Sequence, residues 1–96
     1  MSAEIDLDGP WRLDPQVALR PERFGALAYH FGNRRLSFLK SRRLLDVVRG
    51  LEAAPDTDAA CRAAGVAEGE LPSYRRALAT LAESGMIVPA PEELAA

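Results

Sequence analysis

Residues 25–51 read GALAYHFGNRRLSFLKSRRLLDVVRGL, and this stretch decides the fold because it contains two strands, their turn and a helix. Residues 25–31 alternate between two faces, as a half-buried strand does. Gly32 and Asn33 tolerate positive φ, so residues 32–35 are predicted to turn the chain. Residues 36–40 then return as an antiparallel strand. Ser41 is a suitable N-cap for the helix that follows, whose apolar residues recur at i, i+3, i+4 and i+7: Leu44, Val47, Val48 and Leu51.

One further strand is expected before this stretch. Residues 17–20 form an extended segment that Pro21 is predicted to stop, because proline cannot donate to a strand ladder. Three strands in sequence, at residues 17–20, 25–31 and 36–40, predict a small antiparallel meander.

Two more helices are expected after it. Asp56 or Thr57 caps a short helix that runs to Ala64 and is closed by Gly65. A third helix is predicted from apolar spacings of 3, 4 and 3, with Gly85 just after its end: Leu71, Tyr74, Leu78 and Leu81. The sequence therefore predicts an α+β domain, a three-stranded antiparallel sheet followed by three helices in a winged-helix-like arrangement.

The chain has 96 residues, which favours one small domain and argues against a two-domain enzyme. We divide it into an acidic N-terminal extension (1–15), a folded domain (16–88) that ends in an apolar segment able to seal the core, and a C-terminal tail expected to fray (89–96). Its single cysteine points to a reducing compartment, and no apolar run approaches the roughly 20 residues that span a bilayer. The acidic N-terminus also differs from a signal peptide, so the expected location is the cytoplasm.

Charge is strongly segregated along the chain. Between residues 20 and 49 eight basic residues face two acidic ones, for a net charge of +6, whereas the whole chain has a net charge of −2. Eleven of the twelve basic residues are arginine, which favours bidentate contacts with carboxylate or phosphate groups. An anionic partner and a merely solvated basic face are equally good interpretations of this pattern.

The usual signatures of catalysis are missing from the sequence. One histidine, His30, and one cysteine, Cys61, cannot supply the three or four ligands that zinc needs. The sequence contains no glycine-rich phosphate loop and no nucleophile motif. His30 is expected to be half-buried or at the surface of its strand and not catalytic, and Cys61 to be a small packing residue. A non-catalytic binding module is therefore favoured, with no metal or cofactor of its own.

Two features remain that could bind a partner. Residues 36–40 are flanked by arginine pairs at 34–35 and 42–43, and the third helix carries Tyr74 and Arg75. If this strand lies at a sheet edge beside that helix, an extended acidic peptide can add to the sheet there. The alternative, which the pattern alone slightly favours, is that the apolar residues of both elements are simply core.

The sequence resembles the peptide chaperones of mycofactocin biosynthesis, a branch of the PqqD-like family. The resemblance covers nearly the whole chain and rests on residues 10–13 (PWRL), 19–31 (LRPERFGALAYHF), 34–41 (RRLSFLKS), 71–78 (LPSYRRAL) and 81–88 (LAESGMIV). The second helix departs from the family, because Ala60 and Ala64 stand where larger aliphatic residues are usual.

The resemblance implies a recognition element for ribosomally made, modified peptides, which catalyses nothing. Such a domain binds the leader of a precursor peptide as an added strand beside the third helix. It then presents the peptide to a radical S-adenosylmethionine maturase, which carries the iron–sulfur clusters and S-adenosylmethionine. The candidate peptide-binding residues are Arg34, Arg35, Leu36, Ser37, Phe38, Leu39, Lys40, Tyr74, Arg75 and Leu78.

The competing interpretation is a winged-helix regulator that binds nucleic acid, with Arg75 and Arg76 on a recognition helix. A nucleic-acid-binding domain usually has a basic overall charge, whereas this chain has a sequence pI near 5.3. The strands also precede the helices, which leaves only residues 86–88 to build a wing. Peptide recognition is therefore favoured over nucleic-acid binding.

Overall fold

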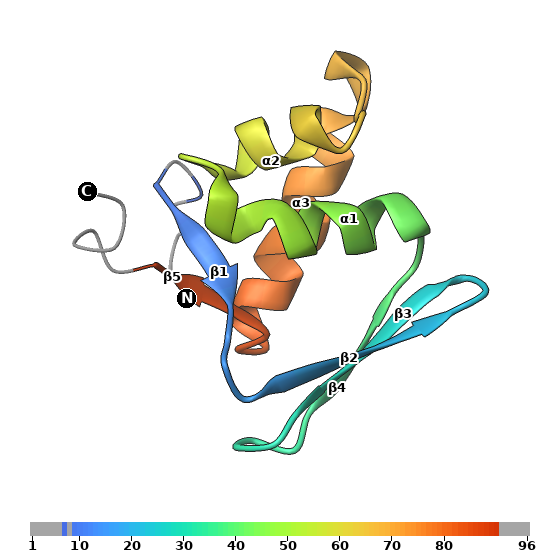
Figure 1. Ribbon diagram of the computed structural model, residues 1–96, viewed down its shortest axis with the longest axis vertical. Coiled ribbons are helices and arrows are strands. Elements are labelled where there is room, and N and C mark those ends of the chain that lie inside the picture. The colour runs from blue at the N-terminus through green and yellow to red at the C-terminus, as the bar shows by residue number, and fades with distance from the viewer. Residues whose placement is uncertain (1–6, 8, 91–96) are drawn as a thin grey trace.

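The computed structural model describes residues 7 and 9–90 and has the predicted α+β class, with antiparallel sheets and three helices (Figure 1). Two single 3-10 turns, Leu51–Ala53 and Glu68–Glu70, lie between the helices. The elements in chain order are β1 (Trp11–Leu13), β2 (Val17–Glu22), β3 (Gly25–His30), β4 (Leu36–Leu39), α1 (Arg42–Gly50), α2 (Thr57–Ala63), α3 (Leu71–Glu83) and β5 (Ile87–Pro89).

The strands form two separate sheets rather than one. The predicted meander is present as a three-stranded antiparallel sheet in the order β2-β3-β4. The second sheet was not predicted: β1 pairs antiparallel with β5, so Trp11 lies opposite Pro89 and Leu13 opposite Ile87. The apolar segment that ends the expected folded domain at residue 88 therefore seals the core as strand β5.

This second sheet moves both expected domain boundaries outward. Trp11 is only 7% exposed and belongs to the hydrophobic core, although it falls inside the segment expected to be an extension. Ala90 donates its backbone N–H to the Pro10 carbonyl at 2.9 Å, so the first residues of the expected tail are held by the fold. Residues 1–6 and 8 of the extension and residues 91–96 of the tail lie outside the described residues.

Pro21 does not stop β2, which continues to Glu22. The Phe31 N–H donates to the Gln16 carbonyl, and hydrogen-bonded pairs alternate along an antiparallel ladder. Pro21, opposite Ala26, therefore occupies a pair in which its nitrogen points away from β3. No donor is needed at that position, which is why an edge strand tolerates proline there.

Local capping confirms the predicted helix starts. Leu44 N donates to Ser41 Oγ at 3.0 Å, and Ala59 N donates to Asp56 Oδ1 at 2.8 Å, so Asp56 rather than Thr57 caps α2. Gly65 follows α2 with φ +91°, the left-handed conformation expected of a residue that closes a helix.

All three helices lie on one side of the three-stranded sheet (Figure 1). The side chains that β3 and β4 turn towards them are buried: Ala26, Ala28 and Leu39. The four residues of the predicted helical spacing are all core, three of them in α1 and Leu51 in the 3-10 turn that follows it: Leu44, Val47, Val48 and Leu51. The core therefore sits between the helices and one sheet face.

Candidate functional site

One edge of β4 is the first element of the site, because β4 pairs with β3 and with no other strand of residues 7 and 9–90. His30 N donates to the Arg35 carbonyl at 3.0 Å, and the pairs alternate along the ladder, so Ser37 and Leu39 are bonded to β3. The main-chain N–H and C=O groups of Leu36 and Phe38 therefore point away from β3, towards the open edge. Two donors and two acceptors stand there in the spacing that an antiparallel or parallel strand needs.

The opposite edge of the sheet, on β2, is largely closed. Val17, Leu19 and Pro21 are the residues whose main-chain groups point outward on that strand. Proline has no N–H, and the Val17 N–H is already bonded to the Asp14 carbonyl at 2.9 Å. Blocked positions of this kind prevent pairing at a sheet edge. Of the two edges of this sheet, that of β4 is therefore the more open to pairing.

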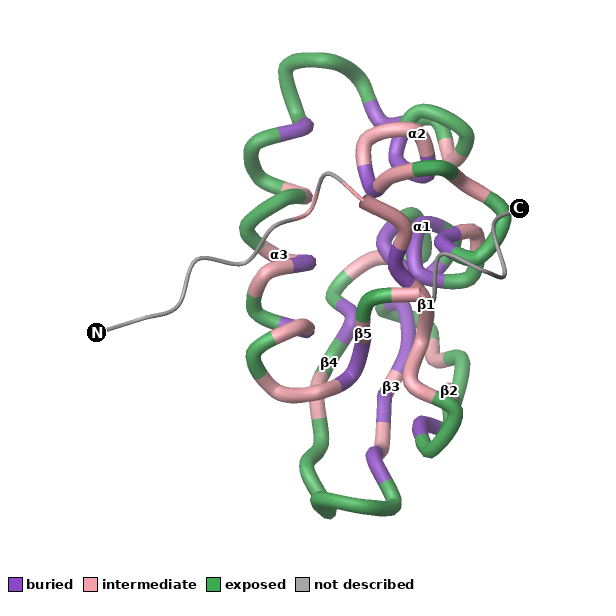
Figure 2. The backbone as a smooth tube through the Cα atoms, turned by 90° about the vertical axis from the view of Figure 1, so that its left-hand side faces the viewer, coloured by how far each residue is buried: buried purple, intermediate pink, exposed green. Residues whose placement is uncertain are grey.

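A groove runs between β4 and α3, which lie side by side in the chain trace (Figure 2). Its volume is about 330 Å³, and its wall on the helix side is made of small and apolar side chains. A second hollow of about 170 Å³ shares Leu44 and Ala77 with it and extends it along α3 towards Tyr74. The groove is lined by Leu36, Ser37, Phe38, Lys40, Leu44, Ala77, Thr80 and Leu81.

Polar contacts fix one end of the groove. Asn33 Nδ2 donates to the Ser84 carbonyl at 3.0 Å, which ties the β3–β4 turn to the end of α3. The hydroxyls of Ser37 and Ser84 lie 3.5 Å apart at the same place. These contacts join two segments about fifty residues apart in sequence, so they set the separation of β4 and α3.

His30 organises the same turn and is more buried than the half-buried or surface position expected for it. Its Nδ1 accepts from the N–H of Gly32 at 3.0 Å and of Asn33 at 3.1 Å. An imidazole nitrogen that accepts carries no proton, so in the neutral ring the proton is on Nε2, which lies 3.4 Å from Asp14 Oδ2. The ring is buried, and it holds the turn that precedes β4.

The structure distributes the predicted site residues over three environments. Leu36, Ser37, Phe38 and Lys40 line the groove, and Tyr74 lines the hollow that continues it. Leu39 and Leu78 are 1% and 0% exposed, so they support the groove from the core instead of lining it. Leu36 and Phe38, which the alternative interpretation assigned to the core, are 53% and 58% exposed.

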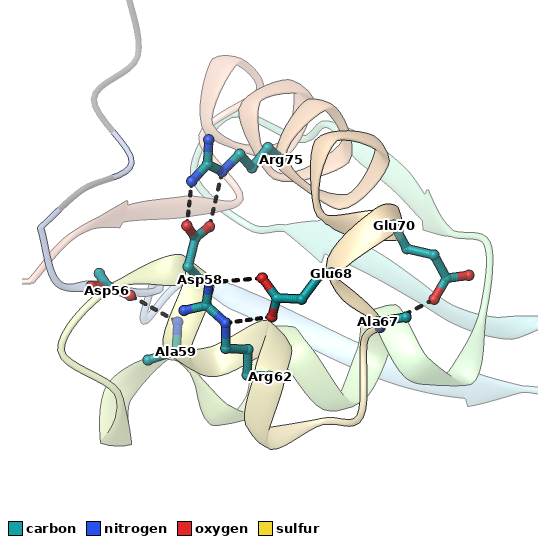
Figure 3. A network of polar contacts seen from close by, with 8 residues as sticks. All are labelled: Asp56, Asp58, Ala59, Arg62, Ala67, Glu68, Glu70 and Arg75. Carbon is teal, nitrogen blue, oxygen red and sulfur yellow. Dashed lines mark hydrogen bonds and ion pairs between the residues drawn. The ribbon is translucent and has the colours of Figure 1, made fainter.

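Arg75 differs most from expectation, because it points towards α2. Its guanidinium pairs with the Asp58 carboxylate through two nitrogens (Figure 3). This hydrogen bonding holds the pKa of Asp58 below its usual value. Arg62 and Glu68 form a second pair nearby, at 2.7 Å. Arg75 is therefore part of a contact between α2 and α3, and not of the groove or of a free nucleic-acid-binding face.

Other basic residues remain available beside β4. Arg34 and Arg35 precede the strand, Lys40 follows it, and all three are exposed. They form no ion pair with any residue within 7 and 9–90. Uncompensated positive charge at both ends of an open strand favours an acidic segment over a basic one.

Sequence reasoning missed the helix side of the groove: Leu44, Ala77, Thr80 and Leu81. Ala77 and Thr80 are too small to stand out in an apolar pattern, yet their small size leaves the space open. Their spacing from Tyr74, by three and six positions, was the available signal, since it places them along one side of α3.

Two kinds of site were looked for and not found in the part of the chain that is described. Residues 7 and 9–90 contain no group of three or more His, Cys, Asp and Glu side chains that could hold a metal ion. Among the same residues, no helix is both long enough and apolar enough to cross a membrane.

Comparison with known proteins places the chain in a family. The model of the peptide chaperone MftB family matches residues 10–88. A peptide chaperone MftB of Mycobacterium tuberculosis is 57% identical over 92% of this chain and 81% of its own length, and one of Mycobacterium ulcerans is 60% identical over 88% and 78%. A third, of Mycolicibacterium smegmatis, is 53% identical over 88% and 83%. No solved structure matches. The chain belongs to the peptide chaperone MftB family.

Proposed function

We propose that the chain binds the leader of a ribosomally made precursor peptide as a strand added to β4. It then presents the peptide to a radical S-adenosylmethionine maturase in mycofactocin biosynthesis, in the cytoplasm. The observation that carries the proposal is the outer edge of β4, which pairs with no strand in the described part of the chain and faces a groove against α3. The family's description as peptide chaperones supports a peptide as the ligand of this edge.

Backbone pairing supplies the part of the affinity that does not depend on sequence. An added strand can make about four hydrogen bonds with the outward groups of Leu36 and Phe38. Each is worth about 0.5 to 1.5 kcal/mol net of the water bonds that it replaces. Such a sum is largely offset by the cost of ordering the peptide, so side-chain contacts in the groove must supply the remainder.

Alternate side chains of the added strand have different surroundings. Those on the helix side enter the groove against Ala77, Thr80 and Leu81, where small apolar side chains fit. Those on the other side lie next to Leu36 and Phe38. Arg34, Arg35 and Lys40 favour acidic residues at the ends of the bound segment. We expect a leader with alternating apolar residues and flanking carboxylates.

In this proposal the chain carries no chemistry of its own. The iron–sulfur clusters and S-adenosylmethionine belong to the maturase, and the chaperone contributes orientation and local concentration of the peptide. The leader loses its conformational entropy when it binds to β4, before it meets the maturase. The maturase therefore receives a segment that is already extended.

Filling the groove tests the proposal. In Ala77→Phe a large side chain projects into the space shared by both hollows. Ala63→Phe is the matched control, because Ala63 is exposed at the end of α2 and away from β4. We expect titration calorimetry with a synthetic leader to show at least a tenfold loss of affinity for Ala77→Phe and no change for Ala63→Phe. Equal affinity of both variants, with native amide spectra, would refute binding in the groove.

A further inference from the structure

The helices leave one face of the three-stranded sheet uncovered (Figure 1). Large hydrophobic side chains on that face are exposed. Phe24, Phe31, Leu36 and Phe38 are 47%, 62%, 53% and 58% exposed. The register places Leu36 opposite Tyr29 and Phe38 opposite Leu27 on one face, and ring contacts join Phe24 to Phe38 and Phe31 to Tyr29. We call this the outer face, made of Phe24, Leu27, Tyr29, Phe31, Leu36 and Phe38.

Ring contacts make the outer face one continuous surface. The rings of Phe24 and Phe38 meet edge to face with centroids 5.9 Å apart, and those of Tyr29 and Phe31 do so at 5.2 Å. Contiguous exposed apolar surface of this kind marks an interaction site on small soluble proteins. The outer face and the groove lie on different sides of β4. They share Leu36 and Phe38, because these two residues stand at the edge between them.

Charge around the outer face selects the kind of partner. Arg20 lies opposite Leu27 on the same face, and exposed Arg23, Arg34, Arg35 and Lys40 surround it, against Glu22, which pairs with Arg20 at 3.0 Å. A second copy of the chain would bring two basic margins together, which is unfavourable. Single-stranded nucleic acid needs flat ring platforms, whereas these rings pack edge to face and two leucines lie between them. An apolar protein surface with an acidic margin is the complementary partner.

The bound peptide would enlarge the outer face. A strand added to β4 continues the sheet, so its alternate side chains lie beside Leu36 and Phe38 on the outer side. The three strands, of six, six and four residues, cover at most roughly 20 by 14 Å, far below the roughly 800 Å² that each partner buries in a stable complex. A fourth strand adds about a third to that area. A partner on this face would therefore touch chaperone and peptide together.

We infer that the outer face is the docking surface for the protein that acts on the bound peptide, and that the leader completes this surface. The inference rests on the proposed function, because it requires the leader on β4. Since coupling between two ligands is reciprocal, the leader raises the affinity for that protein and the protein raises the affinity for the leader by the same factor.

The test uses the radical S-adenosylmethionine maturase as the probe, with and without saturating synthetic leader. Phe24→Ser/Phe31→Ser changes the outer face without replacing any groove-lining residue. Because the Phe24 ring packs on Phe38, Phe31→Ser alone is measured beside it, and the fold of both variants is checked by amide spectra. We expect the double variant to bind leader within twofold of the wild type. We also expect it to lose at least tenfold in affinity for the maturase and to lose the enhancement by leader. Arg20→Glu/Arg23→Glu is a second variant that leaves the rings intact and should weaken maturase binding at low salt.

The groove variant Ala77→Phe separates this inference from the proposed function. It should lose leader binding and the leader-dependent enhancement while it keeps the basal affinity for the maturase. Two results would overturn this inference and leave the proposed function standing. One is a wild-type protein that binds leader but not the maturase, and the other is unchanged maturase affinity in both double variants of the outer face. Binding of an oligonucleotide, or self-association, that Phe24→Ser/Phe31→Ser abolishes would do the same. No binding of leader to the wild type would overturn the proposed function.

Discussion

Reversing the charge at the start of β4 should weaken leader binding in a way that salt can erase. In Arg34→Glu/Arg35→Glu both changed side chains are exposed, and neither arginine pairs with an acid within the described ranges, so both are available to the peptide. An exposed contact between arginine and carboxylate is worth about 0.2 to 1 kcal/mol. Two lost contacts, with repulsion in their place, amount to about 1 to 2 kcal/mol, or roughly 5- to 30-fold in affinity.

The assay is calorimetric titration with the synthetic leader at two salt concentrations. At low salt the full loss should appear, whereas at 1 M salt, where the screening length falls to about 3 Å, variant and wild type should converge to within about twofold. Arg20→Glu/Arg23→Glu is the control, because it makes the same change in net charge near the closed edge. Unchanged affinity of Arg34→Glu/Arg35→Glu at low salt, or equal losses in both variants, would refute local recognition of acidic residues at β4.

The remaining predictions concern the frame that holds the groove. Leu39→Ala removes a side chain that is 1% exposed beneath β4, so the urea midpoint should fall by the equivalent of about 2 to 5 kcal/mol with an unchanged slope. Gly25→Ala should cost more than about 1 kcal/mol in thermal unfolding, because φ is +156° and the new Cβ would collide with the Leu39 carbonyl oxygen. The folded-state pKa of Asp58 is lowered by Arg75, so this pair stabilises the protein above the unfolded-state pKa and its contribution is lost as the pH falls through the folded-state pKa. Asp58→Asn should therefore lower the free energy of unfolding by no more than about 1 kcal/mol at neutral pH, because Arg75 is half exposed. The variant's free energy of unfolding should also fall less steeply in acid than that of the wild type. The same acid profile in both proteins would contradict this.

Much of the fold was predictable because its signals are local. The spacing of Leu44, Val47, Val48 and Leu51 identified α1, and Ser41 identified its start. The alternation in β3 and β4 and the turn between them gave the meander, since strand, turn and strand are neighbours in sequence. These elements carry the open edge, so the position of the edge followed from the sequence.

The second sheet could not be predicted in this way. β1 and β5 have three residues each, too few to show a period, and more than seventy residues separate them in the chain. Their pairing is decided by the burial of Trp11 and Ile87 in the common core. Pro21 was a different case, because whether its nitrogen faces a partner depends on register and not on composition.

Rotation of α3 explains the differences at the candidate site. Tyr74, Arg75 and Leu78 are close in sequence, but they meet the groove, α2 and the core respectively. Spacing defines the sides of a helix, whereas the packing of its neighbours decides which side faces β4. The small residues Ala77 and Thr80 give no apolar signal, so the wall that they form was visible only in the structure.

Strand addition at β4 is tested most directly by hydrogen exchange of its amides with and without leader. The amides of Ser37 and Leu39 are bonded to β3 and should be protected in the free protein, whereas those of Leu36 and Phe38 should exchange freely. With free leader at about one hundred times its Kd, exchange at Leu36 and Phe38 should slow by about 100-fold. Exchange at these two amides that stays fast under saturating leader would contradict strand addition.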